Sequence, residues 1–277
     1  MKISCQNGLA GPGAFFEQFQ RLKAWGFEGV EMSVWDRLDG CRCKKILSLE
    51  TEIRQAVDQT GLPVISICGG IHFEFMDVDP AKRRADMERM KNVLRLAGRL
   101  KAGGVIMVPV FHQHIHGVTP PPDLSPWKTS VELQKELLVL ELGELATVAE
   151  EAGTSVILEP LNRHEAPWFN RLDQATEICE RVNSKAVGFM ADFFHMNIEE
   201  TDTPAAIRQN RKYLRHVHLA DNTRLQPGTG STNFKAGFAA LKEIGFKDAM
   251  ALECGVSGPA AEALPMCVRF LKKLRDG

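Results

Sequence analysis

The sequence predicts an α/β protein of the (β/α)8 TIM barrel class, with residues 1–277 forming one domain. Eight short apolar runs, most of them rich in β-branched residues, recur along the chain, and most precede a longer amphipathic stretch. Near-continuous apolar runs are typical of strands covered on both faces, as in parallel sheets under helices. Eight such repeats favour a closed barrel over an open sheet, and 277 residues suit a barrel of this kind.

The predicted strands occupy residues 2–6, 29–34, 63–68, 104–110, 155–161, 187–193, 214–220 and 249–254. Two intervening segments show a clear helical period, with apolar residues at steps of three and four. In 81–101 these are Met87, Met90, Val93, Leu94, Ala97 and Leu100, and in 130–152 they are Leu133, Leu137, Leu140, Leu145 and Val148. We expect Gly103-Gly104 and Gly153 to end these two helices.

Composition excludes several classes of partner. The formal net charge of −1 gives no global field that would attract nucleic acid. No run of about 18 apolar residues predicts a membrane span, and the polar start of the chain does not resemble a signal peptide. Seven cysteines without a framework spacing favour free thiols in a reducing compartment. We therefore expect a cytoplasmic protein with a small-molecule partner.

Four ligand-capable side chains lie at the carboxyl ends of the last four predicted strands. Glu159, Asp192, His218 and Glu253 follow one another at intervals of 33, 26 and 35 residues, each of which fits one strand and one helix. Barrel enzymes build their sites at this end of the strands. Two glutamates, an aspartate and an imidazole suit a divalent cation such as Mn²⁺, Mg²⁺ or Co²⁺, and a cation would offset the cost of burying the carboxylates.

Strand alternation separates His218 from His216. The two side chains point to the same face because they are two residues apart. His218 is nearer the carboxyl end and is the predicted ligand. His216 lies one layer deeper, and we expect it to be a hydrogen-bonded core residue.

The carboxyl half of the chain resembles the ketose 3-epimerases of the xylose-isomerase-like barrel superfamily. The resemblance is carried by Glu159-Pro-Leu-Asn-Arg-His-Glu165, Asp192-Phe-Phe-His195, His216-Val-His218-Leu-Ala-Asp-Asn-Thr-Arg224 with Pro-Gly-Thr-Gly, and Leu-Glu253. The amino half matches only in its alternation of predicted strands and helices.

This resemblance implies one divalent metal ion, preferably Mn²⁺, held by the four residues named above. It also implies that Glu159 and Glu253 are the two acid/base groups, and that Glu165, His195 and Arg224 contact the substrate. A cation bound to a carbonyl oxygen and the adjacent hydroxyl acidifies the intervening C–H by stabilising an enediolate. One carboxylate then removes the proton, and a carboxyl on the opposite face returns one.

The amino half differs from the family in the residues that would line the sugar-binding cavity. Relatives that act on free sugars usually place aromatic residues near the first strand, whereas this chain has Ser4-Cys-Gln-Asn7 there, and its one tyrosine, Tyr213, lies elsewhere. The loop His112-Gln-His114-Ile-His116 is not a feature of the family. We include His72 and His116 among the candidate substrate contacts, and Glu31, Trp35, Phe111, Trp127 and Trp168 among the residues that can line the cavity.

The leading hypothesis is therefore a metal-dependent keto-sugar epimerase or isomerase, with 3-epimerisation of a ketose favoured. An isomerase or lyase acting on an oxo-sugar, a 3-oxo-glycoside or an inosose would use the same metal site. A zinc-dependent endonuclease of abasic sites would need more ligands in the early strands and a basic surface, and a non-catalytic sugar-binding barrel would not need two buried bases. The resemblance also implies a homo-oligomer, a dimer or a tetramer.

Overall fold

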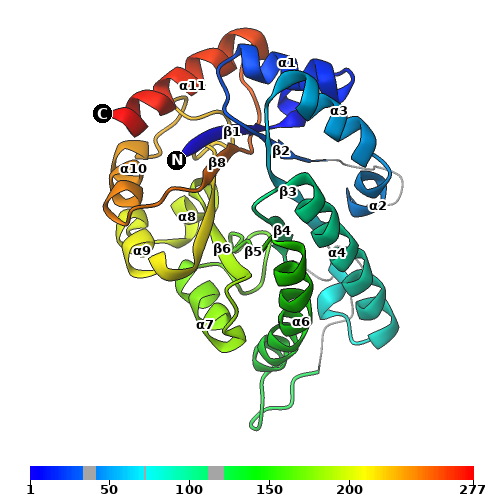
Figure 1. Ribbon diagram of the computed structural model, residues 1–277. Helices are drawn as coiled ribbons and strands as arrows, with labels where there is room; N and C mark the ends of the chain where they lie inside the picture. The colour runs from blue at the N-terminus through cyan, green and yellow to red at the C-terminus, as the bar shows by residue number, and fades with distance from the viewer. Residues whose placement is uncertain (34–41, 72, 112–121) are drawn as a thin grey trace.

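The chain forms a closed barrel of eight parallel strands with helices around it (Figure 1). This computed structural model describes residues 1–33, 42–71, 73–111 and 122–277. The strands are β1 (Lys2–Gln6), β2 (Val30–Met32), β3 (Val64–Ile71), β4 (Val105–Val108), β5 (Val156–Leu158), β6 (Val187–Asp192), β7 (Leu214–Leu219) and β8 (Ala249–Leu252). Each strand pairs with the next in sequence, and β1 closes on β8 through the register Lys2↔Ala249 to Cys5↔Leu252. The predicted fold class is confirmed.

The helices cover the outside of the barrel. They are α1 (Phe15–Ala24), α2 (Arg42–Leu47), α3 (Glu50–Thr60), α4 (Pro80–Leu100), α6 (Ser130–Ala152), α7 (Leu172–Val182), α8 (Phe193–Glu199), α9 (Thr203–Gln209), α10 (Phe234–Glu243) and α11 (Ala260–Asp276). Short 3-10 turns lie at η1 (Asn7–Ala10), η2 (Phe73–Met76) and η3 (Arg211–Tyr213). No helix in the described ranges is long and apolar enough to cross a bilayer.

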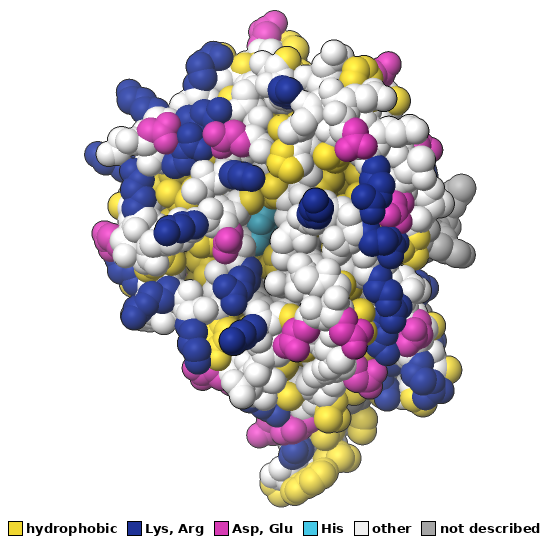
Figure 2. Space-filling model, viewed as in Figure 1, with side chains coloured by type: hydrophobic (Ala, Val, Ile, Leu, Met, Phe, Trp, Pro, Cys, Tyr) yellow, Lys and Arg dark blue, Asp and Glu magenta, His cyan; other side chains and the backbone are white. Residues whose placement is uncertain are grey.

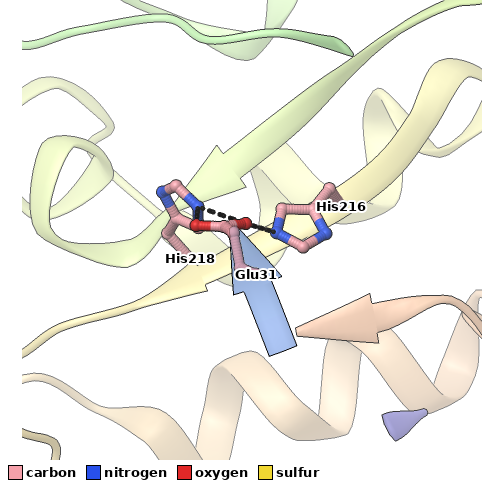
Figure 3. A group of neighbouring side chains, drawn as sticks. All are labelled: Glu31, His216 and His218. Atoms are coloured by element: carbon pink, nitrogen blue, oxygen red, sulfur yellow. Dashed lines mark hydrogen bonds and ion pairs between the residues drawn. The ribbon is translucent and has the colours of Figure 1, made fainter. Parts of the chain in front are cut away.

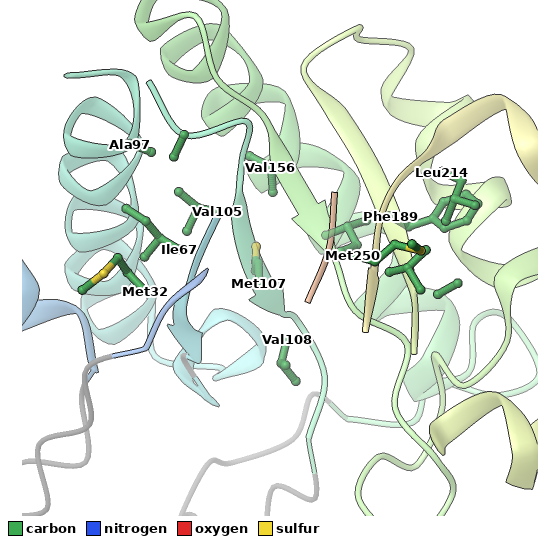
Figure 4. Close-up of a cluster of buried hydrophobic side chains, with 14 of the residues drawn as sticks. Met32, Ile67, Ala97, Val105, Met107, Val108, Val156, Phe189, Leu214 and Met250 are labelled. Carbon is green, nitrogen blue, oxygen red and sulfur yellow. The ribbon is translucent and has the colours of Figure 1, made fainter. Parts of the chain in front are cut away.

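The apolar core is divided by the barrel wall. Val105 and Met107 of β4 pack outward in the large core cluster with helix residues such as Ala97 of α4 (Figure 4). Ile106, between them, belongs to a separate small cluster with Cys68, Ile157 and Met190. This division follows from the two-residue period of a strand, and it leaves much of the barrel interior to polar side chains.

The two predicted long helices are confirmed in extent, but their ends and buried faces differ in part from the prediction. α6 begins at a capping box of Thr129 and Glu132 and ends at Gly153, whose φ is 69°. α4 ends at Leu100 and is capped by Lys101, which lies in the left-handed region with φ 57°, so Gly103-Gly104 does not cap it. Gly104 instead allows β5 to approach, since a Cβ there would lie 2.3 Å from Cδ1 of Ile157.

The buried face of α6 also differs from the prediction. Leu140 is 71% exposed, while Leu138, Leu142, Leu145 and Ala149 are buried. The helix is so rich in leucine that several stripes fit the helical period, and contact with α4 and α7 selects one of them.

Candidate metal centre

The four predicted ligands converge at the carboxyl ends of β5 to β8. Glu159 and Glu253 directly follow β5 and β8, Asp192 is the last residue of β6, and His218 lies near the end of β7. One donor atom from each can be chosen so that all four lie within 4.8 Å of one another. Nδ1 of His218 lies 3.0 Å from Oε2 of Glu253, 3.6 Å from Oε1 of Glu159 and 3.7 Å from Oδ2 of Asp192.

Local structure holds these side chains in place. The backbone N–H of Glu159 donates to the carbonyl of Met107 on β4. Oδ1 of Asp192 caps α8 by accepting from the backbone N–H of Phe194 at 2.8 Å. This leaves Oδ2 of Asp192 directed at the centre. Glu159, Asp192 and His218 are each less than 5% exposed, so water screens their charges weakly.

A network below the centre fixes His218 (Figure 3). Both carboxylate oxygens of Glu31 lie close to Nε2 of His218, at 3.0 and 3.2 Å, and Oε2 also lies 2.9 Å from Nε2 of His216. Gln6 and Ser66 donate further hydrogen bonds to Glu31, at 3.0 and 2.7 Å. With Nε2–H held by Glu31, Nδ1 of His218 faces the three carboxylates of the centre. The position predicted for His216, one layer deeper, is confirmed.

The carboxylates and the imidazole strongly shift one another's pKa values. Burial alone would lower the pKa of His218, but the charges of Glu31 and Glu253 raise it well above its usual value. Burial raises the pKa of Glu159. Burial opposes ionisation of Glu253 as well, yet His218 and Arg224 lower its pKa to about 2. The charge state of each of these groups therefore depends on that of its neighbours, and a divalent cation at the centre would favour the ionised carboxylates.

The residues present fit a divalent cation. Nδ1 of His218 is buried and has no hydrogen-bond partner of acceptable geometry in the described part of the chain, although three carboxylates surround it. An imidazole nitrogen in this position is well placed to bind a metal ion, with Glu31 as the outer carboxylate that orients it. Three carboxylates and one imidazole suit Mn²⁺, Mg²⁺ or Co²⁺.

Arg224 lies at the mouth of this centre. Its Nη1 is 2.6 Å from Oδ2 of Asp192 and its Nη2 is 2.5 Å from Oε2 of Glu253, so one guanidinium bridges two of the candidate ligands. The guanidinium also lies over the ring of Phe194, at 4.8 Å from its centroid. Its backbone φ of 57° shows that the loop after β7 turns sharply to place it there.

His195 is buried at the edge of the centre. The backbone N–H of Asn162 donates to its Nδ1 at 3.2 Å, which leaves the ring proton on Nε2. Nε2 points into the site, 3.7 Å from Oδ2 of Asp192 and 3.9 Å from Oε1 of Glu159. His195 can therefore donate a hydrogen bond to an oxygen bound there.

Glu165 lies farther out, with a side chain that is 40% exposed. Its Oε1 accepts from Nδ2 of Asn162 at 2.8 Å. It pairs with neither neighbouring arginine, because Arg163 binds Glu199 and Arg171 binds Asp173. Its Oε1 also lies 3.9 Å from Nδ1 of His195, beside the centre.

The outcome differs among the remaining candidates. His72, Trp35, His112, His114 and His116 lie outside the described residues. Trp168 is a core residue whose Nε1 donates to Gln134, whereas Trp127 is 71% exposed. Sequence reasoning missed Gln6, which donates to Glu253 at 2.9 Å as well as to Glu31, and Cys68, whose Sγ lies 3.5 Å from Oε1 of Glu253. Their inward-facing positions near the carboxyl ends of β1 and β3 were the available signal.

In the Pro-Gly-Thr-Gly loop, the backbone N–H groups that could bind an anion already donate to the carboxylate of Asp221. Asp221 accepts five backbone N–H groups, those of Asn222, Gly228, Thr229, Gly230 and Thr232. A Cβ on Gly230 would lie 2.5 Å from Oδ1 of Asp221, so the turn requires glycine there. These N–H groups are not available to a substrate phosphate.

Comparison with known proteins identifies the family of the chain. The family model described as "Xylose isomerase-like TIM barrel" matches residues 19–274. The chain belongs to the xylose isomerase-like TIM barrel family. Among its relatives, 3-dehydro-D-guloside 4-epimerase of Escherichia coli is 33% identical over 87% of each chain. A D-psicose 3-epimerase of Enterocloster bolteae is 38% identical over 42% of this chain and 38% of its own length.

Two solved epimerase structures superpose over nearly the full chain. The apo structure of the 3-keto-D-glucoside 4-epimerase of E. coli matches with a TM-score of 0.85 at 30% identity, covering 99% of both chains. The D-psicose 3-epimerase of Clostridium cellulolyticum, solved with D-tagatose, has a TM-score of 0.80 over 99% of both chains, but at 19% identity it shows the shared fold alone.

Proposed function

We propose that the protein is a divalent-metal-dependent epimerase that inverts a carbon next to the ketone of a keto-sugar. The observation that carries the proposal is the placement of two glutamates about one point. Glu159 and Glu253 come from β5 and β8, and their carboxylate oxygens lie 3.6 and 3.0 Å from the same atom, Nδ1 of His218. Inversion requires two proton-transfer groups that approach one carbon from opposite faces.

Glu159, Asp192, His218 and Glu253 are the residues that would hold the cation, with Mn²⁺ preferred. Bound there, a divalent cation would polarise the ketone and the neighbouring hydroxyl and so acidify the C–H between them.

The chain's own groups then move the proton. One glutamate, as the carboxylate, takes the proton from the carbon beside the ketone, and the C–H electron pair forms a C=C bond while the carbonyl pair moves to oxygen. The other glutamate, as the acid, returns a proton to the opposite face of the same carbon, and the ketone forms again. His195, through Nε2–H, and Arg224 donate to the substrate oxygens, and Glu165 accepts from a hydroxyl at the rim.

For the substrate we propose a 3-keto-glycoside that is epimerised at carbon 4. The relative that matches over 87% of both chains is named for a 4-epimerisation of this kind, whereas the D-psicose 3-epimerase matches over 42% of this chain. The absence of aromatic residues from the Ser4-Cys-Gln-Asn7 segment also favours a substrate other than a free ketose. The 3-epimerisation of a free ketose, favoured by sequence alone, is the second candidate. Both reactions invert the carbon beside a ketone.

The test is solvent exchange in ²H₂O. The Mn²⁺-loaded protein would be incubated with 3-keto-glucosides and with free ketoses, and the products analysed by NMR. We expect deuterium at carbon 4 of a 3-keto-glycoside, together with the 4-epimer. Exchange at carbon 3 of a ketose would support the second candidate, and a migrated carbonyl would identify an isomerase. The absence of exchange in every sugar would overturn the proposal.

A further inference from the structure

The opposite end of the barrel contains a hollow that the proposed reaction does not use. Its volume is about 450 Å³, and it lies at the amino ends of the strands. Barrel-interior side chains of Ile157 and His216 line it, and the buried Glu31 lies between His216 and the candidate metal centre. The hollow and the centre are therefore separate.

The charged side chains around this hollow are mostly positive. The cationic side chains that line it are Lys2, Lys101, Lys185, Arg215 and Lys247, and the single carboxylate is that of Asp248. Lys2 and Arg215 lie at the amino ends of β1 and β7, whereas Lys101, Lys185 and Lys247 lie in the segments that lead into β4, β6 and β8. Figure 2 shows a central hollow with a histidine at its base and Lys and Arg side chains gathered around it. The whole chain has a formal net charge of only −1, so this concentration is local.

The five cations have no ion-pair partner among the residues that the structure describes. Within the described ranges, no ion pair involves any of their side chains, although the rest of the surface is rich in pairs such as Arg208–Glu243 and Arg99–Glu50. Like charges around a concave, partly desolvated surface repel one another and focus a positive potential into it. A bound anion would relieve that repulsion.

We propose that this hollow binds a small, multiply charged anion, a compound that carries several phosphate or carboxylate groups. Lysine and arginine form charge-assisted hydrogen bonds with both groups. A concave volume of about 450 Å³ suits a small molecule rather than an extended polymer. Arg215 is held in place because its Cγ packs over Gly188, where a Cβ would lie 2.4 Å away.

The experiment is calorimetric titration of the full chain with two probes, inorganic triphosphate and citrate, at low ionic strength. We expect saturable binding of at least one probe at one site per chain, weakened by added salt. Tighter binding of triphosphate identifies a phosphorylated ligand, and tighter binding of citrate identifies a polycarboxylate.

The variant that tests the site is Lys185→Gln/Lys247→Gln, in which two exposed cations of the hollow become neutral. We expect its Kd to rise about tenfold or more, because charge-assisted contacts are lost. The matched control is Lys235→Gln/Arg269→Gln, which removes two exposed cations outside the hollow and should change Kd less than about twofold. If neither probe binds saturably, or if both double variants weaken binding equally, the proposal is wrong. Thermal melting of each variant confirms that the fold is kept, and Lys2→Gln/Lys101→Gln replaces the first pair if it does not fold.

Discussion

At the scale of single residues, the candidate centre depends on the orientation of one imidazole. Glu31 binds Nε2 of His218 and so directs Nδ1 to the three carboxylates. Outer carboxylates of this kind raise the basicity of a ligating histidine and fix its ring. Glu31 itself is fixed by hydrogen bonds from Gln6 and Ser66.

The first prediction concerns this outer carboxylate. Glu31→Gln should weaken Mn²⁺ binding about 10- to 100-fold, because a neutral amide holds Nε2–H of His218 less strongly. Metal affinity measured by calorimetry checks this. Glu28→Gln is the matched control, since Glu28 precedes the same strand but pairs with Arg275 away from the centre. Equal metal affinity in Glu31→Gln and wild type would falsify the orienting role.

The second prediction concerns the proposed acid/base pair. Glu253→Gln should lower kcat/KM by about 10²- to 10⁴-fold, because an amide neither takes nor returns the proton. Three ligands remain, so Mn²⁺ should still bind. Turnover and metal content measured on the same sample separate the two roles. Normal turnover by this variant would remove Glu253 from the mechanism.

At the scale of elements, helix α6 carries a buried carboxylate that the site does not use. Glu141 is 6% exposed, and its Oε2 has no hydrogen-bond partner in the described part of the chain. Burial raises its pKa to about 8, and Arg83, whose Nε lies 3.6 Å from Oε1, offsets only part of this.

The third prediction is the pH dependence that follows. In the folded state Glu141 keeps its proton up to about pH 8, whereas in the unfolded chain it loses the proton near pH 4.5, the ordinary pKa of a glutamate carboxyl. The folded state binds more protons between these values, so this group makes the free energy of unfolding fall as pH rises, by about 1.4 kcal/mol per pH unit.

Glu141→Gln should therefore be more stable than wild type at pH 8 by a few kcal/mol, with the difference vanishing toward pH 4.5. Urea unfolding at several pH values measures this. Glu151→Gln, a change on the same helix away from the buried face, should show no such trend. A pH-independent difference between Glu141→Gln and wild type would contradict the assignment.

At the scale of the whole molecule, the centre joins four strands of the barrel, so metal binding and folding are coupled. The fourth prediction is that Mn²⁺ at about 100 times its Kd stabilises the folded state by about 2.7 kcal/mol. The midpoint of thermal unfolding should rise by roughly 5 °C and fall again when a chelator is added. Asp192→Asn should show a smaller rise. Identical melting with and without Mn²⁺ would count against a metal centre.

The sequence alone determined the barrel, its strand order and the four convergent residues. Near-continuous apolar runs predict strands that are covered on both faces. Eight repeats of strand and helix leave few topologies other than a closed barrel. Because the carboxyl ends of parallel strands meet at one rim, spacing was enough to bring together Glu159, Asp192, His218 and Glu253. Helix ends and faces were less determined, as Lys101 and Leu140 show, because several residues satisfied the same local pattern.

Only the tertiary structure decided what surrounds those four residues. Gln6, Glu31, Ser66 and His216 meet across β1, β2, β3 and β7, which lie far apart in sequence, and no local pattern encodes their contacts. The bridge that Arg224 makes between Asp192 and Glu253 likewise depends on how its loop turns. Local periodicity fixes which strand end carries a side chain, whereas closure of the barrel fixes which side chains it faces.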